Sequence, residues 1–265
     1  MKKLHVWILA VALIAVIAVG GTAAYFSGKD EVVNVFKIGE IDIELKEPNW
    51  KETDGQDLTA GATLIKDPTV IATKGQSYMR IRVKIVDGAG NLITDGARLN
   101  MILDTLYYDK SYVYTGKSDV TAVTELVKGE IYGESQLETL VLQGKIQKEY
   151  NHDDFTFAGI VAGQPAVRYY NYNGIFDAES LPPDIATLFT NVVVPIEWTS
   201  ANMAFLNGDT YVEGVGGSVQ IIAKGIGCKI LISAEVIQSA NITDAETAFM
   251  LLDQETGVTR DTSGL

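Results

Sequence analysis

Polar and apolar residues alternate along much of the chain, which is the pattern of half-buried β-strands. From Ile41 onward, every second residue is apolar for several positions and the intervening residues are charged. The same alternation is clearest in residues 78–87, where the apolar set is Met79, Ile81, Val83 and Ile85 and the basic set is Arg80, Arg82 and Lys84. We expect this basic set to form a solvated sheet face. A basic docking surface is the alternative.

The second half of the chain returns to strand-like segments separated by Gly, Pro, Asn and Asp, namely VRYYNYNGIF, NVVVPIEW, GSVQIIAKG and CKILISAEVIQ. The tyrosines of the first segment could form a stacking platform for carbohydrate. Adjacent residues of a strand point to opposite faces, however, so Tyr169 and Tyr170 cannot share one surface. We therefore expect the aromatic residues of this segment to pack in the core.

Short helices interrupt the strands. Leucine and isoleucine residues at helical spacing predict a helix over roughly 97–107. Ser135 with Glu138, and Thr243 with Glu246, have the spacing of capping boxes and predict the starts of two more helices. Together the patterns predict a mainly β protein with short helical insertions.

The N-terminus has the order of a secretory signal peptide, with Lys2 and Lys3 followed by an apolar run and then by small residues up to Ala24. Thr22 and Ala24 occupy the −3 and −1 positions of a cleavage site, so we expect residues 1–24 to be removed and Tyr25 to become the N-terminus. A retained signal anchor is the alternative. Residues 25–255 are expected to form one domain, and the polar residues 256–265 a flexible tail.

The charge of the chain limits its possible binding partners, and its cysteine content limits its possible disulfides. The 265 residues contain 21 Lys and Arg against 34 Asp and Glu, a formal charge of −13. Such a chain is a poor partner for nucleic acid or an anionic membrane surface, so we expect membrane contact only through the uncleaved signal peptide. Cys228 is the only cysteine, which excludes an intramolecular disulfide, and its apolar neighbours predict a buried structural thiol.

The sequence contains few of the residues and motifs that are typical of catalytic sites. His152 is the only histidine after the predicted signal peptide, and the chain contains no H-E-x-x-H, G-x-S-x-G or P-loop motif. Three adjacent residues, His152 to Asp154, do not converge on one metal ion without a special loop. The acidic run around Asp54 and Asp57 allows at most weak calcium binding. We expect no enzyme activity, no cofactor and no metal site.

Four segments, taken in order, resemble the TasA/camelysin family of exported Gram-positive proteins: GTAAYFSGKDEVVNVFKIGEIDIELKE from Gly21, KDPTVIATKGQSYMRIRVKI from Lys66, YYNYNGIF with LFTNVVVPIEW, and ILISAEVIQSANITDAETAF from Ile230. The resemblance implies a jelly-roll-type antiparallel β-sandwich and cleavage by a SipW-type signal peptidase. It also implies secretion to the extracellular matrix or cell surface.

The resemblance implies two alternative activities. One is structural, a subunit of biofilm-matrix fibres, with a possible accessory matrix protein as partner. The other is a camelysin-like, casein-cleaving zinc metalloprotease, which His152 alone supports poorly because such sites take several ligands. A monomeric surface-binding module is a third possibility.

Residues 25–46 contain a candidate assembly strand. Val33 and Val35 lie on one face of an extended segment, and Val32, Phe36 and Ile38 lie on the other. We expect this segment, once released by signal cleavage, to add to an open sheet edge of a neighbouring copy, giving a head-to-tail homopolymer. Pairing within its own subunit, as a hairpin with Ile41–Leu45 across Gly39, is the alternative.

Overall fold

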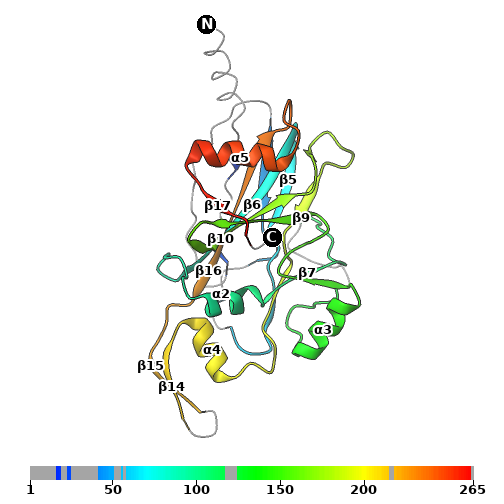
Figure 1. Ribbon diagram of the computed structural model, residues 1–265. Coiled ribbons are helices and arrows are strands. Elements are labelled where there is room, and N and C mark those ends of the chain that lie inside the picture. Colours follow the sequence, from blue (N-terminus) through cyan, green and yellow to red (C-terminus); the bar gives the residue numbers. More distant parts are fainter. Residues whose placement is uncertain are drawn as a thin grey trace.

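The computed structural model describes residues 16–18, 23–24, 41–50, 55, 58–116, 124–214 and 218–263. Within this part every strand pair is antiparallel. The strands form one large sheet and three smaller ones, with four short helices at the ends and one face (Figure 1). The predicted mainly β antiparallel sandwich with helical insertions is confirmed.

The large sheet runs in the order β1-β16-β6-β10-β9-β17, and β2 and β11 pair with β16 and β6 respectively. Its strands are β1 (Val16–Ala18), β2 (Ala23–Ala24), β6 (Gln76–Asp87), β9 (Phe155–Val161), β10 (Gln164–Tyr172), β11 (Phe176–Asp177), β16 (Cys228–Gln238) and β17 (Arg260–Asp261).

A three-stranded sheet has the order β12-β5-β3 and a four-stranded sheet the order β4-β13-β7-β8. Their strands are β3 (Asp42–Lys46), β4 (Thr63–Ile65), β5 (Thr69–Lys74), β7 (Leu106–Asp109), β8 (Ile146–Lys148), β12 (Ile185–Thr187) and β13 (Asn191–Val193). A separate hairpin of β14 (Thr210–Glu213) and β15 (Val219–Ala223) projects from the opposite end of the molecule to helix α5 (Figure 1).

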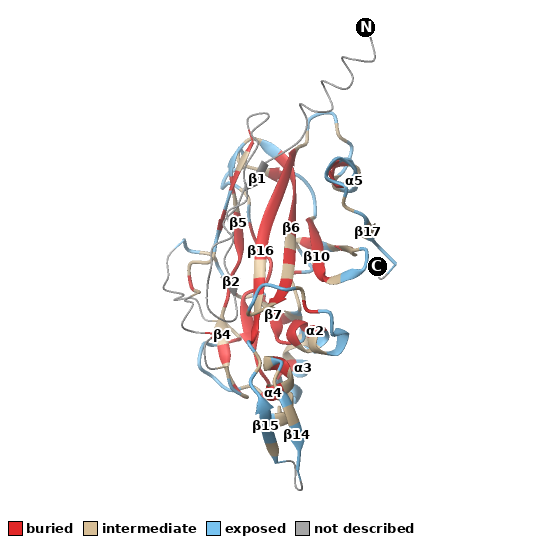
Figure 2. Ribbon diagram, turned by 90° about the vertical axis from the view of Figure 1, so that its left-hand side faces the viewer, coloured by how far each residue is buried: buried red, intermediate tan, exposed pale blue. Residues whose placement is uncertain are grey.

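The core lies between the large sheet and the two smaller sheets. One face of β6 and β16 contributes Met79, Ile81, Ile230 and Ile232, and β3 contributes Ile43, all of them buried in one cluster. In Figure 2 these two long central strands are buried along most of their length, whereas the β14–β15 hairpin is exposed. The alternation in β3 and β6 thus predicts the core-facing residues correctly.

Part of the second face of the large sheet is also covered, a feature that the alternation of apolar and polar residues does not predict. Helix α5 (Ala245–Thr256) lies across it and packs Phe249 and Leu252 against Tyr78 and Ile237. Arg80, predicted to be solvated, is 1% exposed. The expectation of a solvated basic face is therefore wrong at Arg80, although Arg82 and Lys84 remain partly exposed.

Arg80 is buried because acidic and aromatic side chains compensate its charge. Its guanidinium lies 2.5 Å from Glu235 and 2.7 Å from Asp253, and it stacks on the rings of Tyr169 and Phe249. Burial opposes the charged form, but the two carboxylates outweigh it and raise the pKa of Arg80. The network ties α5 to β6 and β16.

The C-terminal tail continues this network. Arg260 pairs with Asp253 at 2.5 Å and with Glu246 at 2.8 Å, and β17 pairs with β9. The predicted tail, residues 256–265, thus contains a short strand at Arg260 and Asp261, and Arg260 binds two carboxylates on α5.

Helix boundaries depend on tertiary contacts. Helix α2 (Gly96–Leu103) ends before the predicted residue 107, because Leu106 and Tyr107 pair with β13. Helix α3 (Glu134–Leu142) starts after Gly133 rather than at Ser135, and the Glu134 amide donates to the distant Glu197 carboxylate at 3.0 Å. Asp244, not Thr243, caps α5. The remaining helix is α4 (Ser200–Asn207).

We predict that Arg80→Met lowers the free energy of unfolding by about 3–5 kcal/mol, because it leaves Glu235 and Asp253 buried beside an apolar side chain. Urea denaturation of the purified chain measures the change. Lys46→Met is the matched control, since Lys46 pairs with Glu44 on an exposed surface, where solvent screens the interaction. Equal effects of the two substitutions would contradict the assignment.

Candidate functional site: the outer edge of β16

The predicted site residues fall mainly outside the described part of the chain. This holds for Thr22 and Tyr25 at the signal boundary and for the whole candidate assembly strand, Val32, Val33, Val35, Phe36 and Ile38. Ala24 is in β2. What the structure does describe is the surface to which such a strand could bind.

The inner edge of β16 is fully paired. All eleven of its residues have partners on β6, from Cys228 opposite Asp87 to Gln238 opposite Ser77. The two strands therefore form the rigid centre of the large sheet, and their ladder leaves no freedom in register on this side.

In the described part of the chain, the outer edge of β16 is paired only through residues of the predicted signal peptide. Strand β1 pairs Val16 to Ala18 with Val236 to Ala234, and β2 pairs Ala23 and Ala24 with Leu231 and Ile230. Cleavage after Ala24 would remove both of these strands from the edge.

Most of both faces of β16 is covered. On one face Ile230, Ile232 and Val236 lie in the core, and on the other Glu235 and Ile237 are buried near α5, while Lys229 and Leu231 remain partly exposed. Glu235 is held by Arg80 at 2.5 Å, and Arg82 lies 3.8 Å away. We therefore expect recognition at β16 mainly through its main-chain edge and the two rows of side chains that flank it.

Strand β3 borders the same region. It is an edge strand of its sheet, pairing with β5, and it lies against β16 and β1. The chain enters β3 directly after residue 40, so the candidate assembly strand is connected to the molecule beside the β16 edge. This position allows the segment either to fold back or to extend to another copy.

The β16 segment has a sequence feature that bears on this edge. CKILISAEVIQ is largely apolar and lacks Pro, although it contains the charged residues Lys229 and Glu235. Such a segment is expected at the centre of a sheet. Only the strand order shows that its outer side is paired, in the described residues, with segments of the predicted signal peptide.

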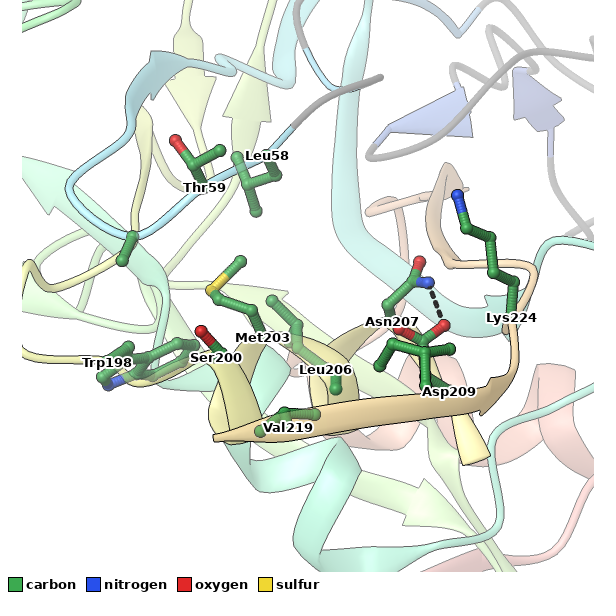
Figure 3. A pocket seen from close by; sticks show the side chains of 13 residues that line it. Leu58, Thr59, Trp198, Ser200, Met203, Leu206, Asn207, Asp209, Val219 and Lys224 are labelled. Atoms are coloured by element: carbon green, nitrogen blue, oxygen red, sulfur yellow. Dashed lines mark hydrogen bonds between the residues drawn. The ribbon is translucent and has the colours of Figure 1, made fainter. Parts of the chain in front are cut away.

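A groove near the projecting hairpin is a second candidate (Figure 3). It has a volume of about 630 Å³ and is bordered by α4, β15 and residues 58–60, with Trp198, Met203 and Leu206 among its apolar side chains. Its carboxylate, Asp209, accepts hydrogen bonds from Asn207 at 2.5 Å and from the Gly225 amide at 2.6 Å. These bonds engage the Asp209 carboxylate in fixing the base of the hairpin, so we assign no chemical role to this groove.

His152 lies on an exposed turn before β9, and its ring Nε2 is 3.0 Å from the Lys148 carbonyl. Its acidic neighbours bind elsewhere: Asp153 pairs with Lys110 at 2.8 Å, and Asp154 accepts from Asn151 at 2.7 Å. In the described ranges no group of three His, Cys, Asp or Glu side chains has the arrangement of a metal site.

Cys228 is buried in the core, as predicted. Burial raises the pKa of its thiol to about 12, although the Arg98 charge opposes this shift. The thiol is therefore protonated at physiological pH and is a poor nucleophile. Among the residues that the structure describes, no helix is long and apolar enough to cross a membrane.

Comparison with known families agrees with the resemblance drawn from the sequence. Residues 1–77 match the family model described as camelysin metallo-endopeptidase, which confirms the TasA/camelysin resemblance over this part of the chain. The matched residues include the predicted signal peptide, the candidate assembly strand and β3 to β5. A comparison with curated proteins gave no match.

We predict that, in a chain beginning at Tyr25 and kept monomeric, alternate amides between Ile230 and Val236 exchange rapidly with deuterium, because those facing the outer edge have lost β1 and β2. The amides facing β6 serve as an internal control and exchange slowly. Residue-resolved hydrogen exchange measures both sets. Uniformly slow exchange along β16 would mean that the edge is already covered within the subunit.

Proposed function

We propose, on the premise of the camelysin-family match over residues 1–77, that this chain is an exported structural subunit of extracellular fibres. The observation that carries the proposal is the outer edge of β16, whose only pairing in the described part of the chain is with residues 16–18 and 23–24. Both belong to the segment that the sequence marks for removal.

The proposed occupant of this edge in the fibre is Val32–Ile38 of a second copy. Its apolar residues, which lie on both faces of the extended segment, suit a position beside β16, where one row of side chains borders the core near Ile232 and the other borders α5 near Ile237. Main-chain hydrogen bonds would provide most of the affinity, and the two apolar rows would fix the register.

Signal cleavage would act twice in this scheme. It would uncover the acceptor edge by removing β1 and β2, and it would free the N-terminal end of the donor segment at Tyr25. A SipW-type signal peptidase is the proposed processing enzyme. An uncleaved chain lacks both a free donor and an open acceptor, so assembly would be confined to the outside of the cell.

Donation from one copy to the next uses two different surfaces, the N-terminal segment and the β16 edge. Such a heterologous contact does not close on itself, and it therefore predicts open filaments rather than dimers. An accessory matrix protein could start or end a filament by offering only one of the two surfaces. Fibres of this kind would be located in the extracellular matrix or on the cell surface.

Deleting Tyr25–Ile38 is predicted to give a folded, less stable protein that forms no filaments, because the acceptor edge of every copy stays open. Added peptide of that sequence should restore stability, which thermal denaturation measures, but should not restore filaments. The same peptide with Val35→Pro is the matched control, because Pro removes a main-chain donor from the ladder. Normal filaments from the truncated chain would contradict strand donation.

We also propose that the chain has no intrinsic peptidase activity, although the family description names one. His152→Ala should leave casein unaffected to the same extent as the unchanged protein, with or without a chelator, because the His152–Asp154 side chains are engaged in separate contacts. A fluorogenic casein assay on purified protein provides the measurement. Chelator-sensitive cleavage that disappears in His152→Ala would establish the metalloprotease alternative.

A further inference from the structure

A buried amine lies against a buried carboxylate at the corner between the two smaller sheets. Lys66 follows β4 directly, Glu47 follows β3 directly, and their side chains are 0% and 1% exposed. The Lys66 Nζ contacts Glu47 Oε1. This pair joins two segments that are nineteen positions apart in the sequence.

The pair lies in a buried environment beside an aromatic ring. The Trp50 ring centre is 4.8 Å from Lys66 Nζ. Two nearby polar atoms, Asn49 Oδ1 and Trp50 Nε1, are buried without a hydrogen-bond partner in the described part of the chain. Ions are costly to hold in such an environment, so a reaction that converts the pair into neutral groups is favoured there.

The site also favours a nucleophilic amine. Burial lowers the pKa of Lys66, and the nearby Glu47 and Asp67 only partly offset this effect. Transfer of the ammonium proton to the contacting carboxylate would give a neutral amine beside a neutral carboxylic acid. A neutral lysine amine held against a carbonyl carbon is an activated nucleophile, with proximity supplying much of the reactivity.

Asp67 acts as a positioning residue for this geometry. Its carboxylate accepts hydrogen bonds from the Asn49 amide at 3.2 Å, from Asn49 Nδ2 at 2.6 Å and from the Tyr112 hydroxyl at 2.7 Å. Asn49 is two residues from Glu47, and Asp67 follows Lys66. The Asp67–Asn49 bonds therefore hold the two reacting segments against each other.

We propose that Lys66 and Glu47 become joined by an intramolecular amide bond. The Lys66 nitrogen attacks the Glu47 Cδ, and the resulting tetrahedral centre loses its hydroxyl group together with a proton from nitrogen. An ammonium and a carboxylate are converted into one amide and one water, so atoms and charge balance without an oxidant or cofactor.

Two other ion pairs in the protein lack the features that this reaction needs. Lys46 and Glu44 lie 2.8 Å apart, but their side chains are 44% and 50% exposed, and a solvated lysine stays protonated. Arg80 and Glu235 are buried, but a guanidinium does not lose its proton in proteins. Lys66 with Glu47 combines burial with an ionisable amine.

The cross-link would change how the subunit withstands force. It would connect the end of β3 directly to the start of β5 and bypass residues 48–65. If the proposed strand donation is correct, tension in a filament enters each subunit through residues 25–40 and β3. The amide would then pass that tension to the sandwich. The chemistry itself does not depend on the proposed function.

Intact-mass spectrometry of the denatured, secreted protein tests the bond. We expect a mass lower than that of the processed sequence by one water, about 18 Da, and a digest containing the peptides of Glu47 and Lys66 as one branched species. Lys66→Met and Glu47→Met should each have their full calculated mass. Lys46→Met should keep the loss, because it changes only the exposed pair.

A wild-type mass equal to the calculated value would overturn the proposal. A loss of water that persists in Lys66→Met would also overturn it, since the loss would then come from another site such as an Asp-Gly succinimide. If either buried variant fails to fold, the branched peptide of the wild-type digest still decides the question. Filament formation is not part of the readout, so failure here leaves strand donation untouched.

Discussion

Main-chain hydrogen bonding along β16 is the constraint on which the rest of this structure depends. The strand is eleven residues long and pairs along its full length with β6. An edge strand of that length and apolar character tends to pair with another chain. In the full-length chain five residues of the outer edge are covered by segments of the predicted signal peptide, and the cleavage that we propose would remove them.

Neither face of the large sheet provides partners for the main-chain groups at the outer edge of β16. One face packs into the sandwich core, and the other is covered at one end by α5, whose position is fixed by the buried ion pairs of Arg80 and Arg260. In the proposed assembly, the outer edge of β16 is therefore the part of the strand that receives a partner. The corner at Lys66 and Glu47 anchors β3, the strand through which the N-terminal segment joins the body of the molecule.

Local sequence patterns predicted the strands and their core-facing residues well. The alternation in β3 and β6 was sufficient because each has one apolar row facing the core. Arg80 was misplaced because its burial requires Glu235 and Asp253, which are more than 150 positions away and cannot be paired with it by any local rule. The predicted helix starts were wrong for a similar reason. At the start of α3, for example, the Glu134 amide donates to the carboxylate of the remote Glu197.

The proposed donor segment has a sequence signal, whereas its proposed acceptor has none. Apolar residues after a predicted cleavage site indicate a strand that can add to a sheet edge, but an unpaired edge is a property of strand order. CKILISAEVIQ looks like a central strand, and only the strand order shows that its outer side is paired, in the described residues, with segments of the predicted signal peptide. Resemblance to a family implied the fold class, while the proposed acceptor residues required the structure.

High-resolution electron cryo-microscopy of filaments grown from the chain beginning at Tyr25 tests the central claim most directly. The account predicts continuous density in which Val32–Ile38 of one copy lies beside Ile230–Val236 of the next, in a ladder that replaces β1 and β2. Filaments whose β16 edge is paired with residues of the same copy, or a preparation that contains no filaments, would contradict it.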